Sequence, residues 1–141
     1  PEANFCINHH NTPVIMEEHI DKQHQLDCRY LRMAMIWAEN SYCRRRQVGC
    51  LVVKDKRIIS DGYNGTPSGF DNIITKLARS HNNSDGATLY VTDAPCIECS
   101  KLIIQAGIKR IVYSHPYRLS DGIDLMRRAG IEIKCINDPT E

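Results

Sequence analysis

The sequence has no excess of charge of one sign, no long apolar run and no export signal. Its 18 Lys and Arg residues are balanced by 17 Asp and Glu, which leaves a formal net charge of +1. This balance gives no general electrostatic reason to bind nucleic acid. No apolar stretch approaches the length that spans a bilayer, and residues 1–15 lack the apolar centre of a signal peptide. These absences predict a cytoplasmic protein with neither nucleic acid nor a membrane as a partner.

The sequence also lacks the signature of a disulfide framework. Its seven cysteines are odd in number and are scattered through predicted helices and strands. Without an export signal, such cysteines are expected to be reduced thiols, some of them metal ligands. The 141 residues, 42% hydrophobic and 25% charged, are typical of one soluble globular domain with a core of its own.

Hydrophobic periodicity predicts a mixed α/β fold. Apolar residues recur at helical spacing over 26–42, and β-rich runs at 48–53 and 57–64 are joined by a short polar turn, which predicts a hairpin. Further along, strands alternate with helices: strands are expected at 87–92, 110–114 and 131–136, and helices at 73–80, 96–106 and 120–129. Because such alternation implies parallel pairing, we expect a three-layer α/β/α domain with a five-stranded mixed sheet.

This domain is expected to cover residues 26–141. Residues 1–25 are predicted to be an N-terminal leader or a disordered arm, since residues 1–15 show no steady period. The arm contains Cys6, His9 and His10, whose side chains can bind metals, but no predicted element holds them in place. We therefore expect no metal site in the arm.

The clearest chemistry lies in the segment Pro-Cys-Ile-Glu-Cys at 95–99, between a predicted strand and a predicted helix. The amino end of a helix favours thiolates, and Pro95 sits where its missing N–H costs nothing. C-x-x-C in this position is typical of a redox pair or of half a catalytic zinc site. A structural zinc knuckle is excluded, because it needs a second cysteine pair or paired histidines at suitable spacing.

Several segments, in the right order, resemble the deoxycytidylate (dCMP) deaminase family, which belongs to the cytidine-deaminase-like superfamily. The resemblance extends from about Leu26 to Ile133. It implies a cytidine-deaminase-like α/β/α fold and zinc-dependent hydrolysis of dCMP to dUMP and ammonia, in pyrimidine nucleotide metabolism, by a homo-oligomer. The segments that carry it are SYCRRRQVG (41–49), GYNGTPSG (62–69), GATLYVT (86–92), PCIEC (95–99), KLIIQAGIKRIVY (101–113) and AGIEI (129–133).

The resemblance also implies roles for individual residues. Cys96 and Cys99 correspond to the two cysteine ligands of zinc, and Asn64 corresponds to the asparagine that hydrogen-bonds the sugar hydroxyl. Arg45 is expected to bind the phosphate, because a guanidinium fork suits a dianion. Tyr117 is expected to close over the base or the phosphate because of its position in the loop after a predicted strand, not because of the resemblance.

The residues alone also allow plainer structural explanations. Asn64 and Gly65 form a common turn pair. Arginines that follow a helix, as Arg45 does, complement the negative end of its dipole.

One part of the family pattern is missing. Zinc deaminases take their third ligand, usually histidine, from a His-x-Glu motif whose glutamate carries protons. No His-x-Glu occurs in the 141 residues, and Asn72 is joined directly to Ile73, where the motif is expected. The sequence therefore offers no identifiable general acid or base, and neither His81, His115 nor Glu98 is expected to replace the missing residues.

Two hypotheses follow for the activity. If the chain truly lacks this segment, it is a catalytically inactive deaminase-fold protein that binds nucleotides or serves in assembly, because losing the proton carrier alone costs roughly 10²–10⁴ in rate. If the native protein carries the segment between Asn72 and Ile73, it is an ordinary zinc-dependent dCMP deaminase. The sequence leaves this choice open, together with the preference for dCMP over deoxycytidine, allosteric control and oligomer number.

Overall fold

The computed structural model describes residues 14–43, 46–65 and 84–140, which contain three helices and five strands. In chain order these elements are α1 (Val14–Ala38), β1 (Gly49–Lys54), β2 (Arg57–Tyr63), β3 (Thr88–Asp93), α3 (Ile97–Gln105), β4 (Arg110–His115), α4 (Asp121–Arg128) and β5 (Glu132–Cys135). No helix in the described ranges is both long and apolar enough to cross a membrane.

The strands form one mixed sheet in the order β2-β1-β3-β4-β5. β1 pairs antiparallel with β2 and with β3, whereas β3, β4 and β5 run parallel to one another. The sheet, the hairpin at its start and the parallel second half confirm the predicted five-stranded arrangement.

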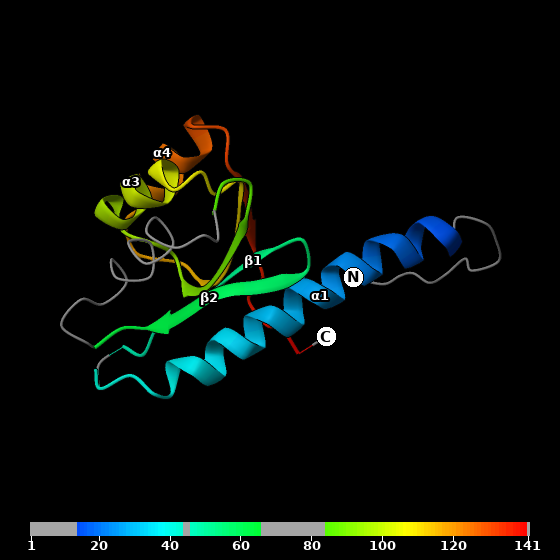
Figure 1. The fold of residues 1–141 in the computed structure, drawn as a ribbon, viewed down its shortest axis with the longest axis horizontal. Helices are drawn as coiled ribbons and strands as arrows, with labels where there is room; N and C mark the ends of the chain where they lie inside the picture. The colour runs from blue at the N-terminus through cyan, green and yellow to red at the C-terminus, as the bar shows by residue number, and fades with distance from the viewer. Residues whose placement is uncertain (1–13, 44–45, 66–83, 141) are drawn as a thin grey trace.

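The sheet lies between helices on both faces, which makes three layers (Figure 1). Successive residues of a strand point to opposite faces. On β3, Tyr90 packs toward α1 in one core cluster with Leu31, while Leu89 packs with Ile103 of α3 and Met126 of α4 in the other. The two clusters confirm the predicted α/β/α order of layers.

The β1–β2 hairpin turns at Asp55 and Lys56, whose φ values are 53° and 64°. A two-residue turn with both residues in the left-handed region matches the twist of the strands that it joins. Aspartate tolerates this conformation well, which explains why no glycine is needed for the first turn residue. The turn places both side chains at the edge of the sheet where β3 and β4 begin.

The first helix differs in extent from the prediction. It covers Val14–Ala38 instead of 26–42, so part of the segment expected to be a leader or an arm is helical. Residues 14–25 are rich in Glu, Lys and Gln, which favour helix without giving an apolar stripe. Its carboxyl end tightens into i to i+3 hydrogen bonds, such as Ser41 N–H to Ala38 C=O at 2.9 Å. The helix expected over 73–80, His81, and the N-terminal Cys6, His9 and His10 lie outside the described residues.

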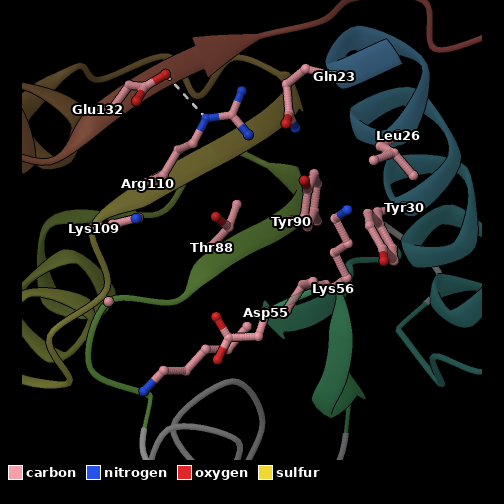
Figure 2. A pocket seen from close by; sticks show the side chains of 13 residues that line it. Gln23, Leu26, Tyr30, Asp55, Lys56, Thr88, Tyr90, Lys109, Arg110 and Glu132 are labelled. Carbon is pink, nitrogen blue, oxygen red and sulfur yellow. Dashed lines mark hydrogen bonds and ion pairs between the residues drawn. The ribbon is translucent and has the colours of Figure 1, made fainter.

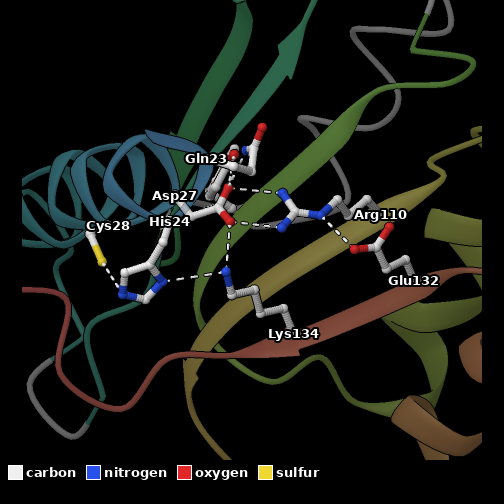
Figure 3. A network of polar contacts seen from close by, with 8 residues as sticks. Gln23, His24, Asp27, Cys28, Arg110, Glu132 and Lys134 are labelled. Carbon is white, nitrogen blue, oxygen red and sulfur yellow. Dashed lines mark hydrogen bonds and ion pairs between the residues drawn. The ribbon is translucent and has the colours of Figure 1, made fainter. Parts of the chain in front are cut away.

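A buried carboxylate joins α1 to three strands (Figure 3). The side chain of Asp27 is 0% exposed. It accepts two hydrogen bonds from the Arg110 guanidinium, at 2.8 and 2.7 Å, one from the Tyr90 hydroxyl at 2.7 Å and one from Lys134 Nζ at 3.1 Å. Arg110 Nε also donates to Glu132 at 3.1 Å. These contacts fix α1 across β3, β4 and β5.

The same contacts determine the charge of Asp27. Burial by itself acts to raise the pKa of this carboxyl, but the hydrogen bonds from Arg110, Tyr90 and Lys134 and the charge of Arg110 outweigh burial and hold the pKa well below its ordinary value. The carboxylate therefore remains ionised in the folded protein well into acid. Because Arg110 and Lys134 would lose their carboxylate partner, removing the charge of Asp27 should lower the stability of the fold.

We predict that Asp27→Asn lowers the free energy of unfolding by about 3 kcal/mol, since removing one partner of a buried ion pair leaves the other uncompensated. Urea unfolding followed by circular dichroism measures this loss. The matched control is Asp124→Asn, whose carboxylate is 56% exposed and 3.7 Å from Arg127, and its expected cost is about 0.5 kcal/mol. Equal losses in the two variants would contradict a special role for Asp27.

The pH dependence of stability provides a second prediction. A carboxyl whose pKa is lowered by folding contributes stability above its unfolded pKa and loses that contribution as the pH falls. For Asp27, with an ordinary value of 3.8, the loss should begin near pH 5 and continue below the ordinary value. Unfolding free energies of the wild type and of Asp27→Asn should therefore converge between about pH 5 and pH 2. Parallel curves over that range would show that Asp27 does not titrate with folding.

Candidate functional site

The candidate site lies where β3 and β4 end. β3 ends at Asp93 and leads through Pro95 into α3, while β4 ends at His115 and leads to Tyr117. Because the two strands are parallel neighbours, with Asp93 opposite His115, their following loops meet at one edge of the sheet. This edge is where open α/β sheets bind their ligands.

A cavity of about 190 Å³ opens at this edge. Four residues singled out from the sequence line it together: Cys96, Cys99, Asn64 and Tyr117. Arg45, the predicted phosphate ligand, lies outside the described residues. The remaining lining residues are Arg46, Val48, Val91, Asp93, Ala94 and Pro95.

The two cysteines open helix α3. Cys96 is the N-cap residue and Cys99 follows in the first turn, so the spacing of three brings both side chains to one face of the helix. The first turn is tied twice to the Cys96 carbonyl, by the backbone N–H of Ser100 at 2.9 Å and by its hydroxyl at 2.8 Å. The helix therefore presents two sulfur atoms to the cavity from a fixed turn, near a helix end that favours negative charge.

Two thiolates are an incomplete ligand set, because catalytic zinc sites use three protein ligands and keep one position open. The described part of the chain contains no group of three or more His, Cys, Asp or Glu side chains that could hold a metal. His115 Nδ1 lies 3.1 Å from Asp93 Oδ1, and Glu98 is an exposed helix residue 3.9 Å from Lys101 Nζ. Taken alone, the described residues do not fit a catalytic zinc ion.

A charged cluster borders the cysteines. The Asp93 carboxylate, only 10% exposed, accepts a hydrogen bond from Arg46 Nε and also contacts His115. The Arg46 guanidinium carbon lies 5.1 Å from the centre of the Tyr117 ring, a cation–π distance. The arginine that the described structure places at the cavity is therefore Arg46.

Sequence reasoning missed Asp93 and chose Arg45 from three adjacent arginines. A signal for Asp93 was available, since it ends a predicted strand directly before Ala94 and Pro95. The choice among the arginines had no such signal, because each of them follows the first helix.

The side chain of Asn64 holds the loop that precedes β1. Its Oδ1 accepts hydrogen bonds from the Ser41 hydroxyl at 2.5 Å and from the Val48 N–H at 2.9 Å, and its Nδ2 donates to the Arg46 carbonyl at 2.8 Å. The next residue, Gly65, has a φ of +92°, and a Cβ there would stand 2.8 Å from the Tyr42 nitrogen. Asn64 thus positions the backbone of Arg46 and also borders the cavity.

Comparison with known proteins identifies the family. The family model of the cytidine and deoxycytidylate deaminase zinc-binding region matches residues 24–115. The chain belongs to the cytidine and deoxycytidylate deaminase family. The match includes Asp27, Asn64, Cys96, Cys99 and His115 of this deaminase-family chain.

Its relatives include deoxycytidylate deaminases. The Saccharomyces cerevisiae deoxycytidylate deaminase is 30% identical in a match that covers 77% of this chain. The match covers only 44% of the yeast protein, so the chain spans less than half of that relative. ComE operon protein 2 of Bacillus subtilis is 32% identical in a match that covers 76% of this chain and 69% of that protein.

Solved structures agree with the family assignment. The apo dCMP deaminase of the cyanophage S-TIM5 has a TM-score of 0.73 and 35% identity, covering 79% of this chain and 98% of the phage chain. The same phage enzyme in complex with dCMP and dUMP has a TM-score of 0.71 and 34% identity, covering 90% of this chain and 100% of that one. The cytidine-deaminase-like fold expected from the sequence is thereby confirmed.

The three hydrogen bonds of Asn64 predict a graded loss of stability. Asn64→Ala should lower the free energy of unfolding by about 2 kcal/mol, because partners of the amide lose their hydrogen bonds. Asn64→Asp keeps the acceptor for Ser41 and Val48 but not the donor to Arg46, so its loss should be smaller. Urea unfolding distinguishes the two, with the exposed Asn137→Ala as control. A loss for Asn64→Ala no larger than that for Asn137→Ala would show that the amide contacts contribute nothing.

Proposed function

We propose that the cavity beside Cys96 and Cys99 binds dCMP, and that the site belongs to a zinc-dependent centre for hydrolysis of dCMP to dUMP and ammonia. The observation that carries this proposal is the meeting of both cysteines with Asn64, Arg46 and Tyr117 in one cavity. Family membership and the dCMP deaminase relatives support the same substrate.

The size of the cavity indicates how the nucleotide would lie. At about 190 Å³ it is smaller than the ~300–1,000 Å³ of typical ligand pockets, so it accommodates only part of a nucleotide. The Arg46 side chain, 43% exposed, lies at the margin. We infer that the base and sugar enter the cavity while the phosphate stays at its mouth.

The contacts of Arg46 suit it to a phosphate. Asp93 engages Nε and the Tyr117 ring lies beside the guanidinium, so the group is oriented in advance. No other described residue hydrogen-bonds the two terminal nitrogens, which suit paired hydrogen bonds to phosphate oxygens. Phosphate binding by Arg45, which lies outside the described residues, remains a separate prediction from the sequence.

The zinc part of the proposal rests on Cys96 and Cys99. A zinc ion in such a centre activates water as the nucleophile, and a glutamate that is not a ligand carries protons. The described residues provide the two thiolates but neither the third ligand nor that glutamate. The role in pyrimidine nucleotide metabolism and the homo-oligomer are proposed from the family resemblance, and the cytoplasmic location remains a prediction from the sequence.

A second candidate is a deaminase-fold protein that binds the nucleotide without turning it over. The specific observation in its favour is the absence of His-x-Glu from the 141 residues. The two candidates share the dCMP cavity and differ in zinc content and chemistry.

Tryptic digestion of the native protein separates the two candidates. If Asn72 and Ile73 are adjacent, digestion releases the peptide 58–76, Ile-Ile-Ser-Asp-Gly-Tyr-Asn-Gly-Thr-Pro-Ser-Gly-Phe-Asp-Asn-Ile-Ile-Thr-Lys. Its detection, together with no zinc and no release of ammonia from dCMP, would establish the binding protein. Its absence, with a peptide that carries His-x-Glu, bound zinc and dUMP formation, would establish the deaminase.

Nucleotide binding tests the shared part of the proposal. We expect the wild type to bind dCMP more tightly than deoxycytidine by calorimetry, and Arg46→Gln to weaken dCMP binding about tenfold, the effect of losing roughly 1.4 kcal/mol of charge-assisted hydrogen bonding. Binding of deoxycytidine should not change. Arg128→Gln, an exposed change on α4, is the control. Equal affinity for dCMP and deoxycytidine would exclude a phosphate site at Arg46.

A further inference from the structure

A second cavity lies at the opposite end of the central strands, where β3 and β4 begin (Figure 2). Its volume is about 440 Å³, more than twice that of the cavity beside the cysteines. Thr88 and Arg110 start the two strands there, and Asp93 and His115 end them at the other site. At about 3.3 Å per residue the strands separate the two cavities by roughly 17 Å. The second cavity is therefore distinct from the deaminase site.

Cations predominate around this cavity. Its lining contains four basic side chains and two acidic ones: Lys54, Lys56, Lys109 and Arg110 against Asp55 and Glu132. Arg110 is already engaged, since Asp27 and Glu132 hold its guanidinium. Neither Lys56 nor Lys109 forms an ion pair with any residue of the described ranges. Among the described residues, two ammonium groups thus line one cavity without forming an ion pair, while Asp55 and Glu132 border the same cavity.

These two lysines come from different elements. Lys56 occupies the β1–β2 turn, and Figure 2 shows its side chain beside Tyr30 and Tyr90. Lys109 directly precedes β4, on the other side of Thr88. A ligand with one charge satisfies one of them, whereas a ligand with several linked anionic groups can reach both.

The surroundings of the lysines are firmly held. Tyr30 packs on Tyr90 with ring centres 5.0 Å apart, and the Tyr90 hydroxyl donates to the buried Asp27. Arg110 is fixed by the same carboxylate. A wall fixed in this way lowers the ordering cost of binding, which leaves more of the electrostatic attraction for affinity.

We propose that this cavity binds a small polyphosphate anion, held between the ammonium groups of Lys56 and Lys109. The anion is either a free polyphosphate or the phosphate chain of a nucleotide, whose base would then lie along the exposed side of Tyr30. The proposal does not depend on the reaction at Cys96 and Cys99.

Calorimetric titration with sodium tripolyphosphate and with ATP tests the proposal. The wild type should bind tripolyphosphate saturably at one site per chain. Lys109→Gln and Lys56→Asn should each weaken binding at least tenfold; asparagine is chosen because it tolerates the left-handed φ of position 56. Asp55→Asn, in the same turn, should tighten binding because it removes a nearby negative charge.

The matched control is Lys101→Gln, which removes the same charge from the exposed face of α3, where Lys101 lies 3.9 Å from Glu98. Its affinity for tripolyphosphate should equal that of the wild type. No saturable binding by the wild type, or an equal loss in Lys101→Gln, would overturn the proposal. Tighter binding of ATP than of tripolyphosphate would identify a nucleotide as the ligand, and equal or weaker binding would identify free polyphosphate.

Thermal unfolding of each variant shows whether the protein remains folded, and dCMP binding provides an independent readout. A variant that loses tripolyphosphate but keeps its melting temperature and its affinity for dCMP supports a separate site. A variant that loses both ligands at an unchanged melting temperature would show that the two anions compete for one site, which would overturn the proposal.

Discussion

The buried ion pair between Asp27 and Arg110 is the interaction on which the arrangement of the molecule depends. A carboxylate with 0% exposure is tolerable only if charge and hydrogen bonds compensate it, and here the compensation comes from three neighbouring strands. Tyr90, Arg110 and Lys134 each contribute a donor from a different strand. Because the carboxylate sits on α1, satisfying it fixes the helix in one position on the sheet. Apolar packing of Leu31 and Ala34 alone leaves more freedom to slide.

With that helix fixed, the two ends of the central strands β3 and β4 differ in their chemistry. At the carboxyl ends of β3 and β4, the loops bring two cysteines, a buried aspartate and an aromatic ring around a small cavity. At the amino ends, the hairpin turn and the start of β4 bring lysines around a larger one. The strands β3 and β4 run from one cavity to the other, so a change in their register would move both cavities together.

The cavity beside Cys96 and Cys99 matches the family resemblance only in part. The C-x-x-C turn, the Asn64 loop and the Asp93 cluster meet around one cavity, so the surroundings of the proposed zinc site are in place among the described residues. The sequence nevertheless contains no His-x-Glu, and two sulfur ligands do not complete a catalytic zinc centre. The fold and the pocket are thus properties of the described residues, whereas catalysis requires two further groups.

Much of this architecture could be predicted from the sequence, because it follows from local patterns. The alternation of strands and helices, the hairpin between the first two strands, and the placement of Cys96 and Cys99 at a helix start all depend on residues close in the chain. The extent of α1 could not be predicted, since its first part carries helix-forming residues without an apolar stripe. The role of Arg46 also escaped prediction, because three adjacent arginines give the same local signal.

What the sequence by itself determined is therefore the set of elements, their order and the cysteine pair that marks the site. Only the tertiary structure decided which side chains meet. Asp27 finds partners 63, 83 and 107 residues away, and Asp93 selects Arg46 from 47 residues away. The spacing of apolar residues predicts only local secondary structure. The pairings of Asp27 and Asp93, in contrast, form because both carboxylates are buried in the folded chain. A charged group taken out of water must find a partner in space, and separation along the chain does not determine which partner that is.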